Sequence, residues 1–390
     1  MKFPTRASDC IAAIIQNFCF SMPSVRRELI SFSTGGGRPS IRGEMLLPRV
    51  RLIQVAAAVC AICVANMAKA QSPTEPANPH ANAKARAILK YFQDRATTTT
   101  NRVLSGQFTQ FGAGANLRLI DQIYEKTGHW PAIVGADYAN LPYDITTNHP
   151  NQTVEEYWKQ GGLVTISFHM YNPANTNDYG LRDKGVDLST LLAPGKVHDE
   201  WMHELDLIAA GLEQLKNDGV VVLWRPFHEM NGDWFWWGAK DPELFIKVWR
   251  QMFDYFTDTK RLDNLLWVYA PNHGQKTAAY YAGDRYVDLV GLDAYTDYID
   301  TNHIHGYPEV SALPKPFGFT EFGPHGPSNP PGDYDYTRFI DGIQSQFPKT
   351  VFFMCWNDRW SLGQNEHTKE LLDNPAIANR EDLPAGLTGN

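Results

Sequence analysis

Two glutamates in this chain each follow an apolar run. Glu229 comes shortly after residues 220–224, and Glu321 comes directly after residues 317–320. No Lys or Arg lies within five residues of Glu321, so burying its carboxylate would be costly unless it is hydrogen-bonded or takes part in chemistry. Glycoside hydrolysis needs two carboxyl groups across one bond. The two glutamates are therefore candidates for such a pair, and for either one alone a salt bridge at a barrel rim is the alternative.

The surroundings of the two glutamates predict different protonation states. Glu229 stands beside His228 and close to four tryptophans, and an apolar environment raises the pKa of a carboxylic acid. Donors such as Arg225 and Tyr295 can reach Glu321, and they would favour its carboxylate form. We therefore expect Glu229 to be the acid/base (proton donor) and Glu321 to be the nucleophile.

Three indoles, Trp234, Trp236 and Trp237, lie within one four-residue stretch that follows Glu229. On a short loop they cannot all face inward, so at least one should offer a flat face to a pyranose ring. We assign this role to Trp234, and packing in the core is the alternative reading. His169 and His228 could be zinc ligands, but no H-E-x-x-H pattern follows. We predict no metal and no cofactor.

Eight apolar segments, most of them followed by a helical pattern, would position these residues. The expected strands are 103–107, 132–137, 163–168, 220–224, 265–270, 287–293, 317–320 and 351–355, and the expected helices include 117–126, 154–160, 199–216, 242–256, a weak one at 275–281, 336–346 and 368–373. Repeated β-then-α units predict a parallel sheet and, at this length, a closed (β/α)8 TIM barrel of class α/β. An open doubly wound sheet is the alternative, but no glycine-rich phosphate fingerprint follows the first strand.

In such a barrel, polar residues at the carboxyl ends of the strands meet on one face. These residues are Asp137, His169, Arg225, His228, Glu229, Asn231, Tyr295, Glu321, Trp356 and Asn357. The polar segment 171–196 is long for a plain connection, and we expect it to form a functional loop over the same cleft.

The N-terminal part of the chain has the pattern of an export signal. Arg49 and Arg51 precede an apolar run, and Ala68-Lys69-Ala70 is typical of a cleavage site. A retained membrane anchor is the alternative, but the run is short for a span. We interpret residues 1–44 as a misassigned N-terminal extension, 45–70 as a signal peptide cleaved near Ala70, 71–82 as a flexible lead-in, 83–375 as the catalytic barrel and 376–390 as a loose tail. The protein is expected to be secreted or periplasmic.

Charge and cysteine content narrow the range of partners. The full chain carries a formal charge of −8, and without residues 1–70, which hold nine basic and three acidic residues, the charge becomes −14. Such an acidic protein is a poor binder of nucleic acid or anionic membranes, so a neutral polymer is the more suitable partner. Only Cys355 lies outside residues 1–70, so the mature chain would have no intramolecular disulfide. We expect a monomer.

Four motifs together resemble a known family. RPFHEMNGDWFWWG at 225–238, SFHM at 167–170, GLDAY at 291–295 and FTEFG at 319–323 are similar to segments of the glycoside hydrolase family 26 β-mannanases. The resemblance covers roughly residues 83–373, and it implies a (β/α)8 barrel and a retaining double displacement. It also implies that Glu229 is the acid/base and Glu321 the nucleophile. Besides this pair, we expect His169, His228, Trp234, Tyr295, Arg225 and Trp356 to contact the substrate.

The resemblance implies hydrolysis of β-1,4-mannosidic bonds in mannan, glucomannan or galactomannan. β-1,3-Xylanases and mixed-linkage glucanases are similar in shape and remain alternatives within the enzymes. A non-catalytic carbohydrate-binding protein is a further alternative, although a binder has no need of two carboxylates across one bond. Asn357 stands where some relatives are expected to carry a basic residue.

Overall fold

A computed structural model describes residues 75–98, 102–140, 144–175, 180–326 and 331–389. The predicted N-terminal extension and signal peptide lie outside these ranges. In the described ranges, no helix combines the length and apolar character needed to cross a membrane.

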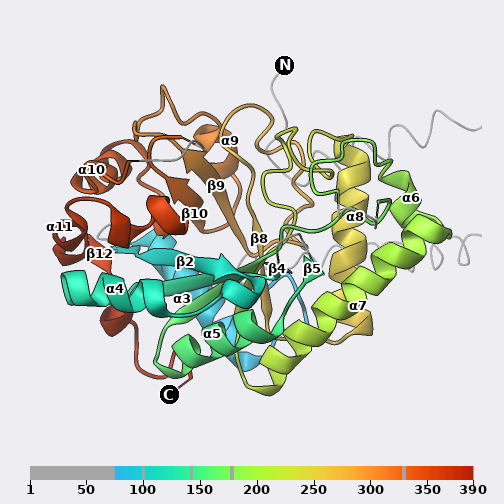
Figure 1. Ribbon diagram of the computed structural model, residues 1–390, viewed down its shortest axis with the longest axis horizontal. Coiled ribbons are helices and arrows are strands. Elements are labelled where there is room, and N and C mark those ends of the chain that lie inside the picture. The colour runs from blue at the N-terminus through green and yellow to red at the C-terminus, as the bar shows by residue number, and fades with distance from the viewer. Residues whose placement is uncertain (1–74, 99–101, 141–143, 176–179, 327–330, 390) are drawn as a thin grey trace, which may run out of the picture. The chain divides into compact units, whose positions relative to one another are not determined.

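Parallel strands form a closed barrel in the described part of the chain (Figure 1). Its eight strands are β2 (Gly106–Phe111), β3 (Ile133–Asp137), β6 (Leu163–Ser167), β7 (Val222–Arg225), β8 (Leu265–Tyr269), β9 (Leu289–Tyr295), β10 (Phe317–Gly323) and β11 (Thr350–Cys355). Each strand pairs with the next, and β11 pairs with both β10 and β2, which closes the sheet. The predicted TIM barrel is confirmed, and the open doubly wound sheet is wrong.

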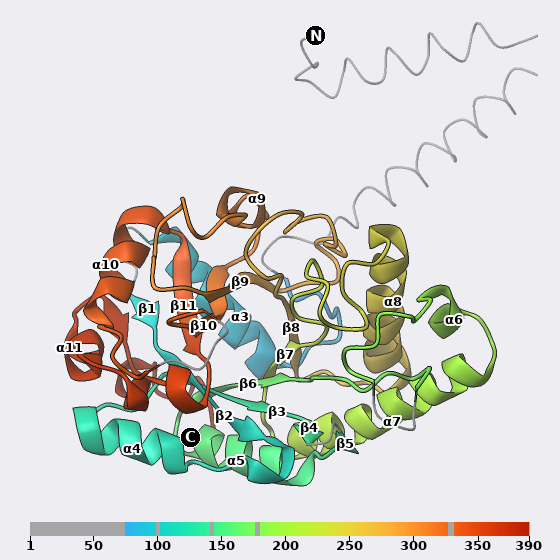
Figure 2. The same cartoon turned by 45° about the horizontal axis from the view of Figure 1, so that its top comes forward.

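Helices surround the barrel, as Figures 1 and 2 show for the long ones. They are α4 (Arg118–Thr127), α5 (Asn148–Lys159), α6 (Ser189–Leu192), α7 (Lys196–Asn217), α8 (Pro242–Asp254), α9 (Tyr307–Ser311), α10 (Thr337–Gln346) and α11 (Thr368–Asp373). Helix α8 begins as the sequence predicts, because Asp241 accepts the Leu244 N–H at 2.9 Å and Pro242 occupies the first turn. A π-helical turn, Tyr255–Thr259, extends it.

The weak helix predicted at residues 275–281 is wrong, because this segment contains a bend and a turn at residues 277–280 but no helix. Side chains from elsewhere take the carbonyls that a helix would use. Asn231 donates to the Gln275 carbonyl at 3.0 Å, and the Tyr269 hydroxyl donates to the Thr277 carbonyl at 2.8 Å. The chain therefore passes from β8 to β9 without a helix.

Helix α3 (Ala83–Thr97) lies at the amino end of the barrel. The Asn82 N–H donates to the Asp263 carbonyl just before β8, and Phe92 packs edge-to-face on Phe352 near the start of β11. Residues 71–82 were expected to be a flexible lead-in. The described part of this segment, from residue 75, is instead held against the barrel. The Ala77 N–H donates to Asp288 Oδ1 at 2.6 Å, and buried Asn78 donates to the Leu262 carbonyl at 2.8 Å.

The loose C-terminal tail predicted at residues 376–390 is also wrong for the described residues. Strand β12 (Ile377–Ala378) pairs with the short strand β1 (Val103–Leu104), which in turn pairs with β11. Beyond β12, the Arg380 guanidinium lies 4.4 Å from the centre of the Trp130 ring. The strand pairing and burial of Ile377 and Ala378 hold the tail against the barrel. The polar composition of the tail had suggested a loose segment.

Candidate active site

Glu229 lies on a strained turn directly after β7. Pro226 has no N–H and ends the strand pairing. Phe227 and Glu229 then take left-handed backbone conformations, with φ of 50° and 56°, which cost a non-glycine residue about 1–3 kcal/mol each. The Phe227 ring is buried against the rings of Trp201, Trp236, Trp237, Phe245 and Trp249, and the Glu229 N–H donates to the Ala270 carbonyl at 2.7 Å. These contacts hold the turn and present the Glu229 side chain at the carboxyl end of the barrel.

Glu321 is presented from β10 at a register shift. The pairing of β10 with β9 and with β11 is irregular between Phe319 and the following residues, and such bulges turn side chains toward a site. Glu321 is 3% exposed. Arg225 Nη2 donates to its Oε1, and the Tyr295 hydroxyl donates to its Oε2 at 2.8 Å. The two donors expected from the sequence therefore both hold this carboxyl group.

A third carboxyl group, that of Asp293, completes the cluster. One oxygen from each of Glu229, Asp293 and Glu321 lies within 4.8 Å of the others. Burial, together with the charges of Glu321 and Asp293, raises the pKa of Glu229 well above its usual value. Burial likewise raises the pKa of Asp293 to about 8, although Arg225 beside it acts in the opposite direction. Ionisation of all three groups is therefore unfavourable, and the cluster retains a proton near neutral pH, as a general acid requires.

These three carboxyl groups have the spacing of a metal site, but donors already engage them. Arg225 donates to Asp293 Oδ2 at 2.9 Å as well as to Glu321, and the Thr320 hydroxyl donates to Asp293 Oδ1 at 2.6 Å. A buried guanidinium in this place supplies the positive charge that a cation would otherwise supply. The residues present therefore suit an ion-paired carboxyl cluster better than a metal centre.

The two histidines form a chain that begins at a buried aspartate. His169 Nδ1 lies 2.8 Å from Asp137 Oδ2, and His169 Nε2 lies 3.1 Å from His228 Nε2. Burial and the nearby charge of Arg225 lower the pKa of His228 well below its usual value, so it is neutral. At the contact between the two rings, one Nε2 donates and the other accepts. The two imidazoles thus bind each other, which does not match the alternative of zinc ligands.

The three tryptophans divide as the sequence suggests. Trp236 and Trp237 are fully buried, and they donate to the carbonyls of Met170 and His228 at 3.1 and 2.9 Å. Trp234 is half-buried and donates from Nε1 to Glu229 Oε2 at 2.5 Å. Its ring lies over Gly232, where a Cβ would meet the indole at 2.2 Å. A glycine is therefore needed for Trp234 to face the cavity.

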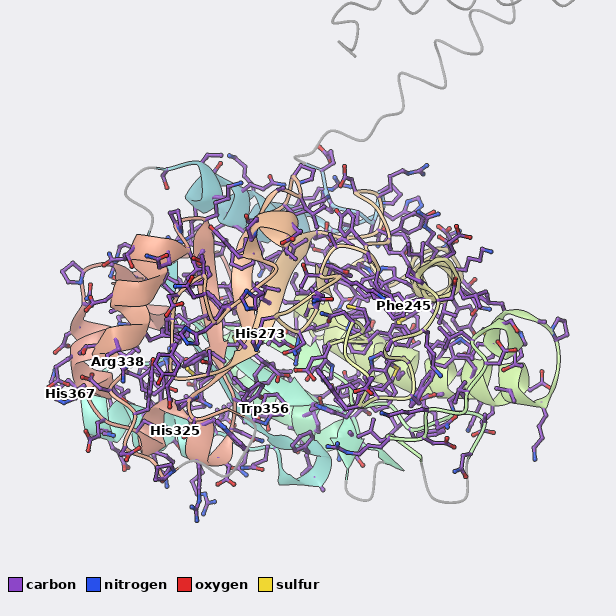
Figure 3. All side chains as sticks on the ribbon, turned by 90° about the horizontal axis from the view of Figure 1, so that it is seen from above. Phe245, His273, His325, Arg338, Trp356 and His367 are labelled. Carbon is purple, nitrogen blue, oxygen red and sulfur yellow. The ribbon has the colours of Figure 1, made fainter. Side chains whose placement is uncertain are left out.

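A cavity of about 690 Å³ opens over the carboxyl cluster. Of the predicted residues, His169, His228, Glu229, Trp234, Tyr295, Glu321 and Trp356 line it. Figure 3 labels two of the lining residues, Trp356 and His273, near the middle of its view. Arg225 is buried beneath this lining and contacts Glu321 instead. The volume is in the usual range for small-molecule sites.

Comparison with known proteins identifies the family. Residues 77–382 match the model described as glycosyl hydrolase family 26. The chain belongs to this family. The protein is 38% identical over 328 residues to "Mannan endo-1,4-beta-mannosidase" of Bacillus subtilis strain 168. This alignment covers 79% of the chain and 89% of that relative. The protein is 35% identical over 334 residues to "Mannan endo-1,4-beta-mannosidase A and B" of Caldalkalibacillus mannanilyticus, 79% of the chain but 63% of that protein's length.

A solved structure agrees with the family 26 assignment. The structure of the Bacillus subtilis mannanase BCman superposes with a TM-score of 0.74 at 35% identity, over 80% of this chain and 97% of that one. The resemblance expected from the sequence motifs is thus confirmed, and so is the class of enzyme, a glycosidase.

Several residues of this family 26 site escaped the sequence reasoning. Asp293 stands inside the motif GLDAY and joins the carboxyl cluster; an acidic residue at the end of an apolar strand was the signal that could have found it. Phe111, Asn272 and His273 also line the cavity, beside Phe235 and Trp360, which from the sequence could equally pack in the core or bind sugar. Asn231, a candidate, holds Asn272 in place instead, accepting its N–H at 2.9 Å and donating to its carbonyl at 2.8 Å. Asn357 is buried and does not line the cavity.

The expected loop over the cleft contributes two residues to the site. Leu181 and Arg182 line the cavity from the segment between β6 and α7. The Leu181 carbonyl accepts the backbone N–H of Trp236 at 2.9 Å, which holds this part of the loop against the buried tryptophans. The segment 176–179 of the same loop lies outside the described residues.

Proposed function

We propose that this chain is a retaining mannan endo-1,4-β-mannosidase that hydrolyses mannan, glucomannan or galactomannan. The observation that carries this proposal is the closeness of Glu229 and Glu321, whose carboxyl oxygens lie within 4.8 Å in the floor of the cavity. Retaining enzymes hold their two carboxyl groups about 5–5.5 Å apart, whereas inverting enzymes separate them by about 6.5–9.5 Å to admit a water molecule. The short separation supports double displacement through a covalent glycosyl-enzyme.

In the first step, the Glu321 carboxylate attacks the anomeric carbon while Glu229 gives its proton to the leaving oxygen. The contacts of Arg225 and Tyr295 with Glu321 favour the ionised nucleophile. The raised pKa of Glu229 keeps its proton available. The glycosidic C–O bond breaks, an ester to Glu321 forms, and Glu229 is left as a carboxylate.

In the second step, the Glu229 carboxylate takes a proton from water, whose oxygen attacks the anomeric carbon. The ester bond breaks, Glu321 leaves as a carboxylate and Glu229 is protonated again. The Trp234 indole N–H, at 2.5 Å from Glu229 Oε2, stabilises the charge that Glu229 carries between the two steps. The enzyme thus returns to its starting state with both protons accounted for.

The choice of mannan rests on the relatives, two of which are named mannan endo-1,4-beta-mannosidase. A panel of mannan, glucomannan, galactomannan, β-1,3-xylan and mixed-linkage glucan tests this choice, with analysis of product lengths to separate endo from exo action. Strong preference for xylan or mixed-linkage glucan would replace the mannanase by one of the alternative β-glycanases. Binding without products from any polymer would leave only a carbohydrate-binding protein.

The nucleophile has its own test. Glu321→Ala should abolish turnover, and azide or formate should restore part of it because a small anion can enter the vacated space. NMR of the first product released by the wild type should show the β-anomer. Initial release of the α-anomer would contradict the retaining mechanism.

We also propose that the protein is exported as a monomer after cleavage near Ala70. The support is the pattern of residues 45–70 described above. Mass spectrometry of the secreted or periplasmic protein should give an N-terminus near Gln71, and light scattering should give the mass of one chain. Recovery of the activity only from membranes, with the N-terminus intact, would favour the retained anchor.

A further inference from the structure

The loop between β9 and α9 carries an exposed aromatic side chain. Tyr298 is 53% exposed, more than any other large hydrophobic residue in the described part of the chain. It follows Tyr295, which lines the cavity, by three residues. Exposed single apolar residues are common, so exposure alone says little. The surroundings of this ring are what point to a function.

The orientation of the Tyr298 ring is fixed by a side chain of its own loop. It stacks on the His303 imidazole, with ring centres 4.2 Å apart and planes 17° apart. His303 Nδ1 lies 2.9 Å from Asp300 Oδ1, and the Asp300 carbonyl accepts the Ile304 N–H at 2.9 Å. Ile304 is fully buried and anchors the loop. One face of the Tyr298 ring is therefore occupied by His303, and the ring has a fixed orientation.

The same loop is fastened to the wall of the cavity. His273 lines the cavity near the centre of Figure 3, and the backbone of His303 faces its ring. The next residue, Gly274, donates its N–H to the His305 carbonyl at 3.0 Å. Gly306, with φ of 88°, lies so close that a Cβ would meet Thr277 at 2.3 Å. The loop that carries the His303–Tyr298 stack therefore adjoins His273 and Gly274 at the wall of the cavity.

On its other side, the loop is tied to the last residue of β10 and to the segment that follows it. The Thr296 N–H donates to the Gly323 carbonyl at 3.0 Å, and the His325 N–H donates to Asp297 Oδ1 at 2.8 Å. Tyr298 thus lies on a loop braced at both neighbouring strand ends of the catalytic face. A rigid aromatic ring on a braced loop loses little entropy when it binds a ligand.

We propose that Tyr298, backed by His303, is an outer stacking subsite for a pyranose unit of the β-glycan whose other units occupy the cavity. The C–H groups of the sugar would pack on the open face of the ring, and the phenol hydroxyl would remain in water. This inference rests on the proposed function and adds to it. It predicts that the enzyme distinguishes long chains from short ones at this loop.

The experiment compares Tyr298→Ala and Tyr298→Phe with the wild type on mannohexaose and mannotriose. Tyr298→Ala should lower kcat/KM for mannohexaose about two- to tenfold, the size expected for loss of one aromatic contact. It should leave mannotriose unchanged, because a short chain fills the cavity without reaching the loop. Tyr298→Phe should behave like the wild type on both substrates, since the ring face is retained.

Tyr124 provides a matched control. It is 42% exposed and also stacks on a neighbour, Trp130, at 4.2 Å. However, it lies near the carboxyl end of α4, and Trp130 precedes β3, so this pair belongs to the amino end of the barrel. Tyr124→Ala should leave both substrates unchanged. His303→Ala, which removes the backing of Tyr298, should lower kcat/KM for mannohexaose in the same direction as Tyr298→Ala.

The possible outcomes separate the two proposals. If the wild type cleaves mannohexaose and Tyr298→Ala affects both chain lengths equally, or neither, the outer subsite is wrong while the proposed function stands. An equal loss with Tyr124→Ala would also overturn the subsite, because it would show a general surface effect. If the wild type cleaves neither mannan nor its oligosaccharides, the proposed function fails and the mannan subsite fails with it.

Discussion

Replacing Tyr295 by Phe removes one hydrogen bond from the proposed nucleophile and little else. The Tyr295 hydroxyl donates to Glu321 Oε2 at 2.8 Å, while Arg225 holds the other oxygen. Burial, together with the charge of Glu321, raises the pKa of Tyr295 well above its usual value. The phenol therefore remains a donor throughout any practical assay range, and Tyr295→Phe tests that donor alone.

The expected loss can be worked out from this contact. When the glycosyl-enzyme is hydrolysed, Glu321 leaves as a carboxylate, so negative charge develops on the oxygen that Tyr295 contacts. A hydrogen bond to a charged group contributes about 1.5–3 kcal/mol, and 1.36 kcal/mol corresponds to tenfold in rate. Tyr295 is half-buried, so water can replace part of the lost interaction. We expect kcat to fall about tenfold, near the lower end of that range.

Two measurements check this prediction. Reducing-sugar assays on mannan give kcat, and rapid quenching followed by mass spectrometry detects the glycosyl-enzyme, which should accumulate because its hydrolysis slows. Tyr280→Phe is the control, since that hydroxyl donates to the Lys240 carbonyl at 3.0 Å and does not line the cavity. It should change the melting temperature slightly and leave kcat unaltered. A kcat for Tyr295→Phe within twofold of the wild type would refute the role of this donor.

Four other predictions follow from the same contacts. The alkaline limb of kcat/KM should lie at higher pH than an ordinary glutamate would give, because burial raises the pKa of Glu229, and Glu229→Gln should abolish this limb in a full pH profile. Asp293→Asn removes a negative charge next to Glu229 and should move the alkaline limb to lower pH. A shift to higher pH would contradict the conclusion that the charge of Asp293 raises the pKa of Glu229. Trp236→Ala should lower the free energy of unfolding by about 3–5 kcal/mol in urea titrations, whereas Trp234→Ala should mainly lower kcat/KM. EDTA should leave activity intact, and a loss that zinc restores would revive a metal site.

The barrel and the meeting of Glu229 with Glu321 could be predicted because both follow from short-range patterns. Apolar runs of strand length alternate with helical spacing, and parallel strands place their carboxyl ends on one face. Glu229 and Glu321 each follow such a run, so their meeting required only the topology. The division of the three tryptophans likewise follows from loop length, since Trp236 and Trp237 fill the core and leave Trp234 at the cavity.

The errors arise where long-range contacts override local composition. Nothing in the polar segment after residue 376 indicates that Ile377 and Ala378 pair with a strand that lies far earlier in the chain. Nothing local to residues 275–281 shows that Asn231 and Tyr269 will take the carbonyls of that segment. Asp293 was missed for a related reason. Its importance depends on Arg225, 68 residues earlier in the chain, which becomes its partner only in the folded barrel.

Arg225 can give two glutamates in one buried site the opposite roles that we propose for them. Three carboxyl groups share this one guanidinium, so full ionisation would leave uncompensated negative charge in the floor of the cavity. Arg225 contacts Glu321 and Asp293 directly, whereas Glu229 receives only the indole N–H of Trp234. In the mechanism that we propose, the group with the weakest donor therefore gives the proton, and the group held by both Arg225 and Tyr295 attacks the anomeric carbon. The proposed difference between acid and nucleophile thus comes from how donors are distributed around chemically identical side chains.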